Sequence, residues 1–271
     1  MFRIALPAAV ASLAVLAIGG VGTSVWAVQV IAIALALAMA AAGPRVVKRV
    51  PADILTLAII VLTLAMLAMT APAADGGPRR WSPLGSLRLY VAPVWLPVFV
   101  WAVSACVRAP GRGVVIASAA ALGVALLLAR QPDASQVLAL VAAMSVVLIG
   151  GRTHWLRSAF VLAVIAMIAA WTFRQPDPLL PVPYVEGVFA LAWGRSMLIG
   201  LAVIASAVAL VAGLQVHALR GHRWASAVAS YYAVLFGCSV MGLTPAPLIG
   251  FGAGPWLGFG LLMAVARRES R

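Results

Sequence analysis

Charged residues are scarce in this chain: they make up 9% of its 271 residues, and only six of them are acidic. A soluble domain carries roughly 25% charged residues, so this composition excludes a soluble protein. Instead, 65% of the residues are hydrophobic and the mean hydropathy is +1.11. The apolar runs are continuous and rich in alanine and leucine, without the alternation of a membrane barrel. Helices are the remaining way to satisfy backbone groups in hydrocarbon, so we predict an all-α transmembrane bundle.

Residues that commonly bind metals are also few. The two cysteines, Cys106 and Cys238, fall in or near apolar segments and form no CxxC or other metal-binding spacing. The three histidines lie in basic loops, away from both cysteines. A disulfide framework is therefore not expected, and no cofactor is indicated with certainty. A divalent cation remains open, although no cluster of ligands in the sequence indicates one.

Positive charge exceeds negative charge, with a formal net charge of +13. No basic run and no soluble module is present to hold a nucleic acid. The alternative is topological, because arginine and lysine keep loops on the cytoplasmic side of a membrane. We therefore predict that the basic residues report the orientation of the spans.

Ten candidate spans follow from cutting the chain at glycine, proline and charged residues, each near the length of about 20 apolar residues that a membrane requires. With the N-terminus and C-terminus in the cytoplasm, inner loops hold 13 Lys and Arg residues and outer loops hold 6. This asymmetry supports the count of ten. We expect one integral membrane domain over 1–271, with a retained first helix and long outer loops at about 72–88 and 174–195. The predicted spans are about 4–20, 24–43, 52–71, 89–107, 113–129, 135–150, 157–173, 196–217, 225–243 and 247–266.

The tetrapeptide Arg-Gln-Pro-Asp occurs twice, at 130–133 and 174–177. In the first copy Asp133 precedes Gln136 by three residues and an apolar run follows, which is a capping-box pattern. We expect both residues to organise the start of a helix. In the second copy Asp177 is followed by prolines at 181 and 183, so it cannot cap a regular helix. Asp177 is then available for chemistry, unless it simply pairs with a neighbouring arginine.

Two further segments carry structural predictions. Pro183 suits the first position of a short helix, which would place Glu186 in the first turn, where the helix dipole favours a carboxylate. Near the last span, Gly250, Gly252 and Gly254 recur at small spacings. They would allow close helix approach or a bent backbone beside a cavity, and packing is the interpretation we favour.

Four motifs together resemble the SEDS family, of the RodA/FtsW type. "DGGPRRWSPLGSLRL" (75–89) is similar to its outer "G-x-R-R-W-x-x-L-G" loop, and "QPDASQVL" (131–138) to its "Q-P-D-L-G-T-A-L". "DPLLPVPYVEGVFAL" (177–191) resembles its "D-P-x-G-x-G-Y-Q-x-x-Q-S" loop. "GLTPAPLIGFGAGPWLGFGLL" (242–262) resembles its "G-x-L-P-x-T-G-x-x-L-P-L-I-S-Y-G-G-S-S" segment. All four occur in order, each on the predicted outer side.

The resemblance implies a membrane enzyme that polymerises glycan strands from a lipid-linked disaccharide, in cell shape or division, in the bacterial cytoplasmic membrane. The aspartate of the family's "D-P" loop matches Asp177, which would act as the catalytic base. Cationic groups would stabilise the lipid pyrophosphate, or would only anchor the loops to anionic headgroups. The expected substrate-binding set is Arg79, Arg80, Trp81, Arg174, Tyr184, Glu186 and Arg195, with Arg88 and Arg130 behind it.

Departures from the family pattern leave two alternatives open. The family's glutamate after the arginine loop is absent from "YVAP" (90–93), and "IGFGAGP" (249–255) lacks the family's hydroxyls. The family also has a segment of roughly forty or more residues that has no counterpart between residues 195 and 200 of this chain. The chain is then a non-catalytic scaffold, or a precursor-binding partner of a cell-wall synthase such as a single-pass transpeptidase. A lipid-linked sugar transporter is the other alternative, although transporters usually place charged groups mid-membrane and this chain has its acids near loops.

Overall fold

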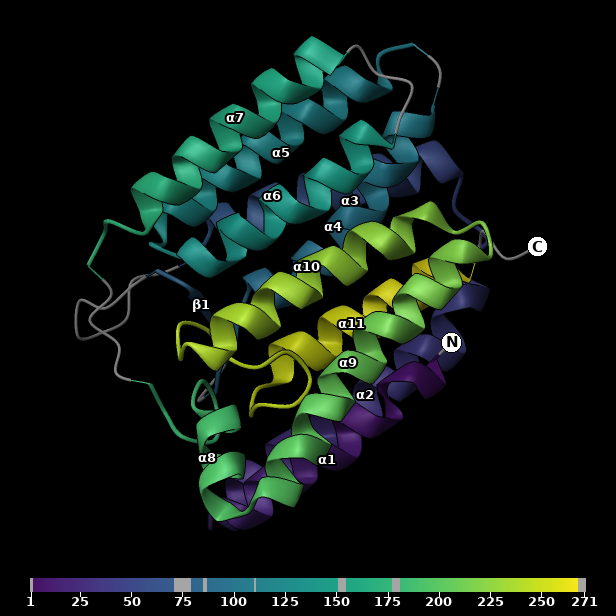
Figure 1. Ribbon diagram of the computed structural model, residues 1–271. Helices are drawn as coiled ribbons and strands as arrows, with labels where there is room; N and C mark the ends of the chain where they lie inside the picture. Colours follow the sequence, from purple (N-terminus) through teal and green to yellow (C-terminus); the bar gives the residue numbers. More distant parts are fainter. Residues whose placement is uncertain are drawn as a thin grey trace.

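The computed structural model describes residues 2–70, 79–84, 87–109, 111–150, 155–176 and 181–267. Over that part of the chain the fold is a bundle of long helices with one small hairpin (Figure 1). The α-helices are α1 (Leu6–Ile18), α2 (Thr23–Val47), α3 (Ala52–Ala68), α4 (Ala92–Arg108), α5 (Gly113–Arg130), α6 (Ala134–Ile149), α7 (Trp155–Thr172), α8 (Val188–Arg195), α9 (Met197–Leu219), α10 (Arg223–Val240) and α11 (Ala253–Ala266). A short 3-10 helix, Phe2–Ala5, precedes α1.

Ten of these helices overlap the ten predicted spans, although α11 begins at Ala253 and not at 247, and α8 is the short extra helix. Four of them, α2, α5, α7 and α9, are each long and apolar enough to cross a membrane, and most of the others are shorter apolar helices. The predicted all-α, polytopic membrane fold is confirmed. The hairpin was not predicted: β1 (Trp81–Leu84) pairs antiparallel with β2 (Leu87–Tyr90), with Trp81 opposite Tyr90.

The interior of the bundle is built around α11, which packs against α2 and α4. Glycines make this contact close: a Cβ on Gly258 would lie 2.0 Å from the Pro93 carbonyl oxygen, and one on Gly260 would lie 2.7 Å from the Ala36 Cα. Trp256 and Phe259 of the same helix are fully buried. Close backbone approach through small residues is the usual way in which helices associate in a bilayer, where burial of apolar surface supplies no driving force between them.

The outside of the bundle is apolar, as contact with lipid requires. Large hydrophobic side chains on α2, α7 and α9 are more than 40% exposed, among them Ile31, Phe160 and Leu198. A soluble protein rarely exposes apolar surface in contiguous patches of this extent. The exposed apolar residues therefore mark the lipid-facing sides of these helices.

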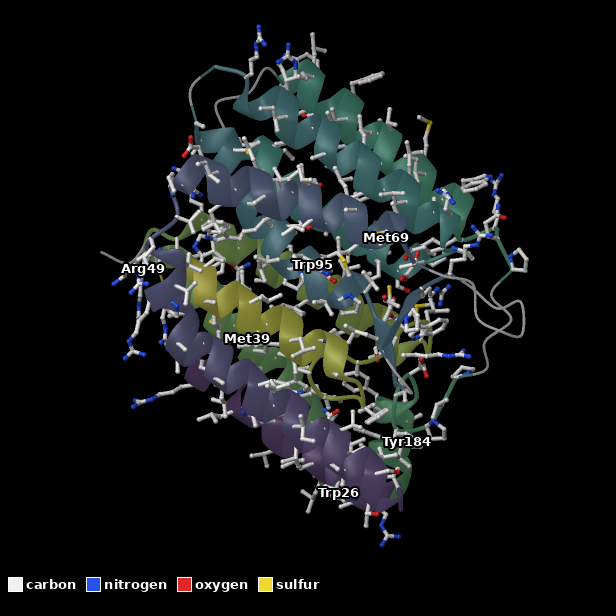
Figure 2. All side chains as sticks on the ribbon, turned by 180° about the vertical axis from the view of Figure 1, so that it is seen from behind. Trp26, Met39, Arg49, Met69, Trp95 and Tyr184 are labelled. Atoms are coloured by element: carbon white, nitrogen blue, oxygen red, sulfur yellow. The ribbon has the colours of Figure 1, made fainter. Side chains whose placement is uncertain are left out.

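The loops of interest gather at one end of the bundle, and the chain begins and ends at the other (Figure 1). We call the first the outer end; it holds the hairpin β1–β2, residues 131–133, α8 and residues 241–252. The inner end holds the N-terminus and the basic loops. Figure 2 shows Arg49 at the inner end, with Met69 and Tyr184 toward the outer end.

Candidate functional site

Arg80 holds the hairpin against the first Arg-Gln-Pro-Asp copy. Its side chain is only 7% exposed. The guanidinium Nε donates to the Gln131 carbonyl oxygen at 3.0 Å, and Nη2 donates to the Pro132 carbonyl oxygen. The two carbonyl groups that directly follow the end of helix α5 thereby accept hydrogen bonds from a side chain outside the helix. Arg80 thus holds these two carbonyls in place, and its predicted role in substrate binding stays a prediction.

The carboxylate of Asp133 accepts a hydrogen bond from the hydroxyl of Tyr90 at 2.5 Å. Asp133 does lie at the N-cap position of α6, yet its side chain forms no capping hydrogen bond, so the predicted capping box is wrong. The physical reason is competition: the hairpin brings the Tyr90 hydroxyl to a buried carboxylate, and Asp133 is only 3% exposed. Charge-assisted bonds of this kind are about twice as strong as neutral ones.

Gln136 extends this contact into the bundle instead of reaching back to the helix start. Its amide Nε2 donates to the Tyr90 hydroxyl at 3.4 Å, and its Oε1 accepts from the Tyr231 hydroxyl at 2.6 Å. Burial, followed by the charge of Asp133, raises the pKa of Tyr90 well above its ordinary value of 10. The Tyr90 hydroxyl therefore stays protonated at physiological pH and keeps donating to Asp133. A cavity of about 10 Å³ beside Tyr90 and Gln136 has room for about one water molecule.

Gln131 joins the same region to helix α3. Its Nε2 donates to the Leu67 carbonyl oxygen at 2.9 Å and to the Thr70 hydroxyl at 3.0 Å. Only 1% of Gln131 is exposed. Residues 131–133 of the first tetrapeptide copy therefore connect α3 and the hairpin to the start of α6, with Gln131 and Asp133 buried.

The second copy begins at the end of α7. Arg174 is exposed, and Gln175 and Pro176 follow it in the described chain. Asp177, the predicted catalytic residue, lies outside the described residues, as do 178–180. Its catalytic role therefore stays a prediction.

The short helix after the second copy starts later than predicted. It begins at Val188, so Glu186 precedes it and does not occupy its first turn. The Val182 carbonyl accepts from the backbone N–H groups of Val185, Glu186 and Gly187, each at 3.0 Å, which closes a compact turn. Glu186 Oε2 accepts from the Val182 N–H at 2.9 Å. That local bond draws the carboxylate toward the turn, which explains why no helix starts at Pro183.

Residues 241–252 connect the two halves of the outer end. The Val185 carbonyl accepts from the Ala246 N–H at 3.1 Å, and the ring of Tyr184 meets that of Phe251 edge-on at 6.1 Å. A Cβ on Gly250 would lie 2.5 Å from the Val185 carbonyl oxygen. We call residues 182–187, which precede helix α8, the α8 turn. The backbone of this turn contacts Gly250 so closely that a larger side chain would not fit there.

The other two glycines complete this connection. Gly252 has a φ of +147°, a conformation that favours glycine, and its N–H donates to the Gln29 Oε1 at 3.0 Å. A Cβ on Gly254 would lie 2.7 Å from the Tyr90 carbonyl oxygen. We call residues 250–254 the glycine segment. It contacts both the α8 turn and the hairpin.

A lateral groove of about 470 Å³ opens between α5 and α7. Its walls include Leu126, Met167 and Trp171, each more than half exposed. The exposed side chain of Arg130, at the end of α5, lies at the outer end of the groove. Arg79 and Arg130 also line one small recess beside Thr70 and Gln131. Two guanidinium groups therefore stand where an apolar, lipid-facing groove reaches the outer end.

The remaining predicted substrate residues lie at two other places. Trp81 is half-buried against Tyr90, with ring centroids 6.2 Å apart. Arg195 is exposed at the end of α8. Among the described residues, no three His, Cys, Asp or Glu side chains come together where they could hold a metal ion. The structure thus brings Arg79 to Arg130, and Tyr184 to the glycine segment, as separate groups at one end.

Several residues of this end were not identified from the sequence. Tyr90 bonds the hairpin to Asp133 at the start of α6, Gln131 bonds to α3, and Tyr231 bonds α10 to Gln136 of α6. Gln29 is fully buried in α2 and bonds the Ser12 hydroxyl at 2.7 Å. An amide inside an apolar span is itself a signal, because a polar group in hydrocarbon requires a partner. That signal indicates a site without naming the partner.

Comparison with known proteins identifies the fold. No family model matches the sequence, and no curated protein matches it. An aspartate-to-alanine mutant of the rod shape determining protein RodA of Thermus thermophilus is similar, with a TM-score of 0.75 and 18% identity over 100% of this chain and 98% of that one. The unmutated RodA gives a TM-score of 0.72 and 19% identity at the same coverage.

A third similar structure is that of a peptidoglycan synthase complex, which concerns the structural coordination of polymerization and crosslinking. Its TM-score is 0.69 at 18% identity, over 99% of this chain and 98% of that one. Together the three likenesses extend over the whole chain, including the hairpin, α8 and the glycine segment. This protein therefore has the SEDS-type fold that RodA has, as a multi-pass membrane bundle.

Proposed function

We propose that this protein is a SEDS-like glycosyltransferase that elongates a glycan strand from a lipid-linked disaccharide at the outer face of the bacterial cytoplasmic membrane. The observation that carries the proposal is the groove between α5 and α7 with Arg130 at its outer end. An apolar, lipid-facing channel that ends in guanidinium groups fits a substrate with an isoprenoid tail and a pyrophosphate head. Arginine binds phosphate oxygens with two parallel hydrogen bonds, which is the geometry such a head requires.

The sequence places Asp177 shortly after the helix that forms one wall of the groove. Trp171 forms part of the groove wall, and Asp177 is the sixth residue after it in the sequence. Six extended residues span at most roughly 20 Å. In this proposal Asp177 acts at the outer mouth of the groove together with Arg79 and Arg130.

The proposed step is a displacement at the anomeric carbon of one lipid-linked sugar. Asp177 takes the proton from the acceptor hydroxyl as that oxygen forms its bond to the anomeric carbon. The bond from the same carbon to the pyrophosphate oxygen breaks, and the lipid pyrophosphate leaves with the bonding electron pair. Arg79 and Arg130 stabilise the negative charge that develops on the leaving group. If a divalent cation takes part, it would assist this leaving group.

Asp177→Ala tests the proposal in a polymerisation assay with purified protein and lipid-linked disaccharide. Loss of a general base lowers a rate by about 10²–10⁴-fold, so product strands should fall below detection while folded yield is unchanged. Asp53→Ala is the matched control, since Asp53 is an exposed carboxylate at the inner end. Full polymerase activity in Asp177→Ala would remove the assigned role.

A non-catalytic scaffold is the second candidate, because a similar structure is that of a peptidoglycan synthase complex. A cell-wall synthase, such as a single-pass transpeptidase, would then be the partner. Wild-type protein that binds the lipid-linked disaccharide, polymerises none of it and copurifies with such a transpeptidase would favour this candidate. Uptake of labelled precursor into vesicles would favour the transporter instead.

A further inference from the structure

A second cavity, of about 660 Å³, lies at the inner end of the bundle, away from every residue assigned above. Residues of α4, α6, α9 and α10 line it, close to where these four helices end or begin. The volume falls within the range of about 300–1,000 Å³ that ligand sites usually have. This cavity plays no part in the proposed glycosyl transfer, whose groups stand at the opposite end.

Two arginines give the cavity its charge. Arg108 ends α4 and Arg223 begins α10, and both side chains are exposed. The Arg223 Nη1 donates to the Gly150 carbonyl oxygen at 3.2 Å, which ties α10 to the end of α6. None of the described residues that line the cavity is acidic. An anion entering here meets positive charge from two helices and no carboxylate in the described part of the wall.

The rest of the wall is partly polar and partly apolar. Ser104, Gln215 and Ser226 supply a hydroxyl, an amide and a second hydroxyl. Leu219 lies in the same wall and is 87% exposed, and Val147 contributes apolar surface deeper in. A soluble phosphate compound has no apolar part that could contact an exposed leucine beside its binding site. A phospholipid has such a part, because its acyl chains are attached to the glycerol that carries the phosphate.

We propose that this cavity binds the phosphodiester headgroup of an anionic phospholipid from the cytoplasmic leaflet, such as phosphatidylglycerol. Arg108 and Arg223 hold the phosphate, and the polar side chains contact the glycerol. The acyl chains continue along the apolar surface around Leu219. Basic pockets between transmembrane helices on the cytoplasmic side are suited to such headgroups. Bound lipid would hold the ends of α4, α6, α9 and α10 together.

The test measures thermal unfolding of the purified chain in detergent with added dioleoyl phosphatidylglycerol. A ligand that binds only the folded state raises the melting temperature with concentration. Phosphatidylcholine tests the need for net negative charge, and glycerol 3-phosphate tests for a soluble phosphate ligand. We expect phosphatidylglycerol alone to raise the melting temperature.

Variants locate the effect. In Arg108→Gln with Arg223→Gln the apparent affinity for phosphatidylglycerol should fall about tenfold or more. The matched control, Arg45→Gln with Arg49→Gln, removes the same charge from the inner end outside the cavity and should retain the affinity. Arg108→Lys with Arg223→Lys keeps the charge and should retain most of it. If the glutamine pair does not fold, bound lipid counted by native mass spectrometry on the lysine pair and the wild type replaces the melting temperature.

Three results would overturn the proposal. One is equal stabilisation by phosphatidylcholine, and another is equal stabilisation by glycerol 3-phosphate. The third is an equal loss of affinity in the two glutamine pairs. None of them bears on the glycosyltransferase assay, so the two proposals fail separately.

Discussion

At the scale of single residues, the hydroxyl of Tyr90 is the donor that satisfies the buried carboxylate of Asp133. Tyr90→Phe removes that donor and should lower the free energy of unfolding by about 1–3 kcal/mol, measured by denaturation in detergent. Tyr232→Phe is the control, because the Tyr232 hydroxyl is buried without a hydrogen-bond partner among the described residues. Its loss should be nearly neutral. Equal destabilisation by both changes would show that the contact with Asp133 contributes little.

The site residues divide according to whether a side chain faces the protein or the surface. Adjacent arginines 79 and 80 looked equivalent in the sequence, yet Arg80 is buried under two carbonyls and Arg79 lines an exposed recess. Asp133 was correctly placed at the start of α6, but its partner was not, because Tyr90 reaches it from a hairpin that only tertiary contacts fold. A motif fixes residue types along the chain, and it does not fix which of them point inward.

At the scale of the element, α11 depends on glycines where it crosses the rest of the bundle. Gly254→Ala places a Cβ 2.7 Å from the Tyr90 carbonyl oxygen, and backbone cannot move aside cheaply. We expect a loss of about 1–3 kcal/mol of stability by denaturation in detergent. Gly237→Ala, in α10, meets nothing within 4 Å and should gain up to about 1 kcal/mol. Comparable behaviour of the two variants would contradict the close packing described for α11.

The long helices could be predicted because each is a continuous apolar run of nearly membrane-spanning length, and hydrocarbon leaves such a run one way to satisfy its backbone. Short elements could not. The hairpin β1–β2 depends on Val91 donating to the Arg80 carbonyl and on Tyr90 reaching Asp133. Helix α8 begins at Val188, later than predicted, because the Val182 carbonyl accepts hydrogen bonds from three N–H groups and forms a turn before it. Contacts between distant segments decide these places.

At the scale of the whole molecule, the groove between α5 and α7 should admit the lipid tail of the substrate. Val164→Trp fills the groove from α7, whereas Ala166→Trp adds the same ring to an exposed position of that helix outside the groove. In the polymerisation assay Val164→Trp should raise KM about tenfold with kcat little changed, which is the pattern of lost uniform binding. Ala166→Trp should match the wild type. An unchanged KM in Val164→Trp would exclude the groove as the tail site.

The central claim is that the end of the bundle bearing Arg130 and Arg174 faces outward, where a lipid-linked sugar is elongated. Labelling of single introduced cysteines in intact cells tests it most directly, with Cys106 and Cys238 replaced by alanine. Arg174→Cys should react with a membrane-impermeant maleimide in intact cells, and Arg112→Cys should react only after the cells are permeabilised. The reverse pattern would place the groove mouth and Asp177 in the cytoplasm and would contradict the account.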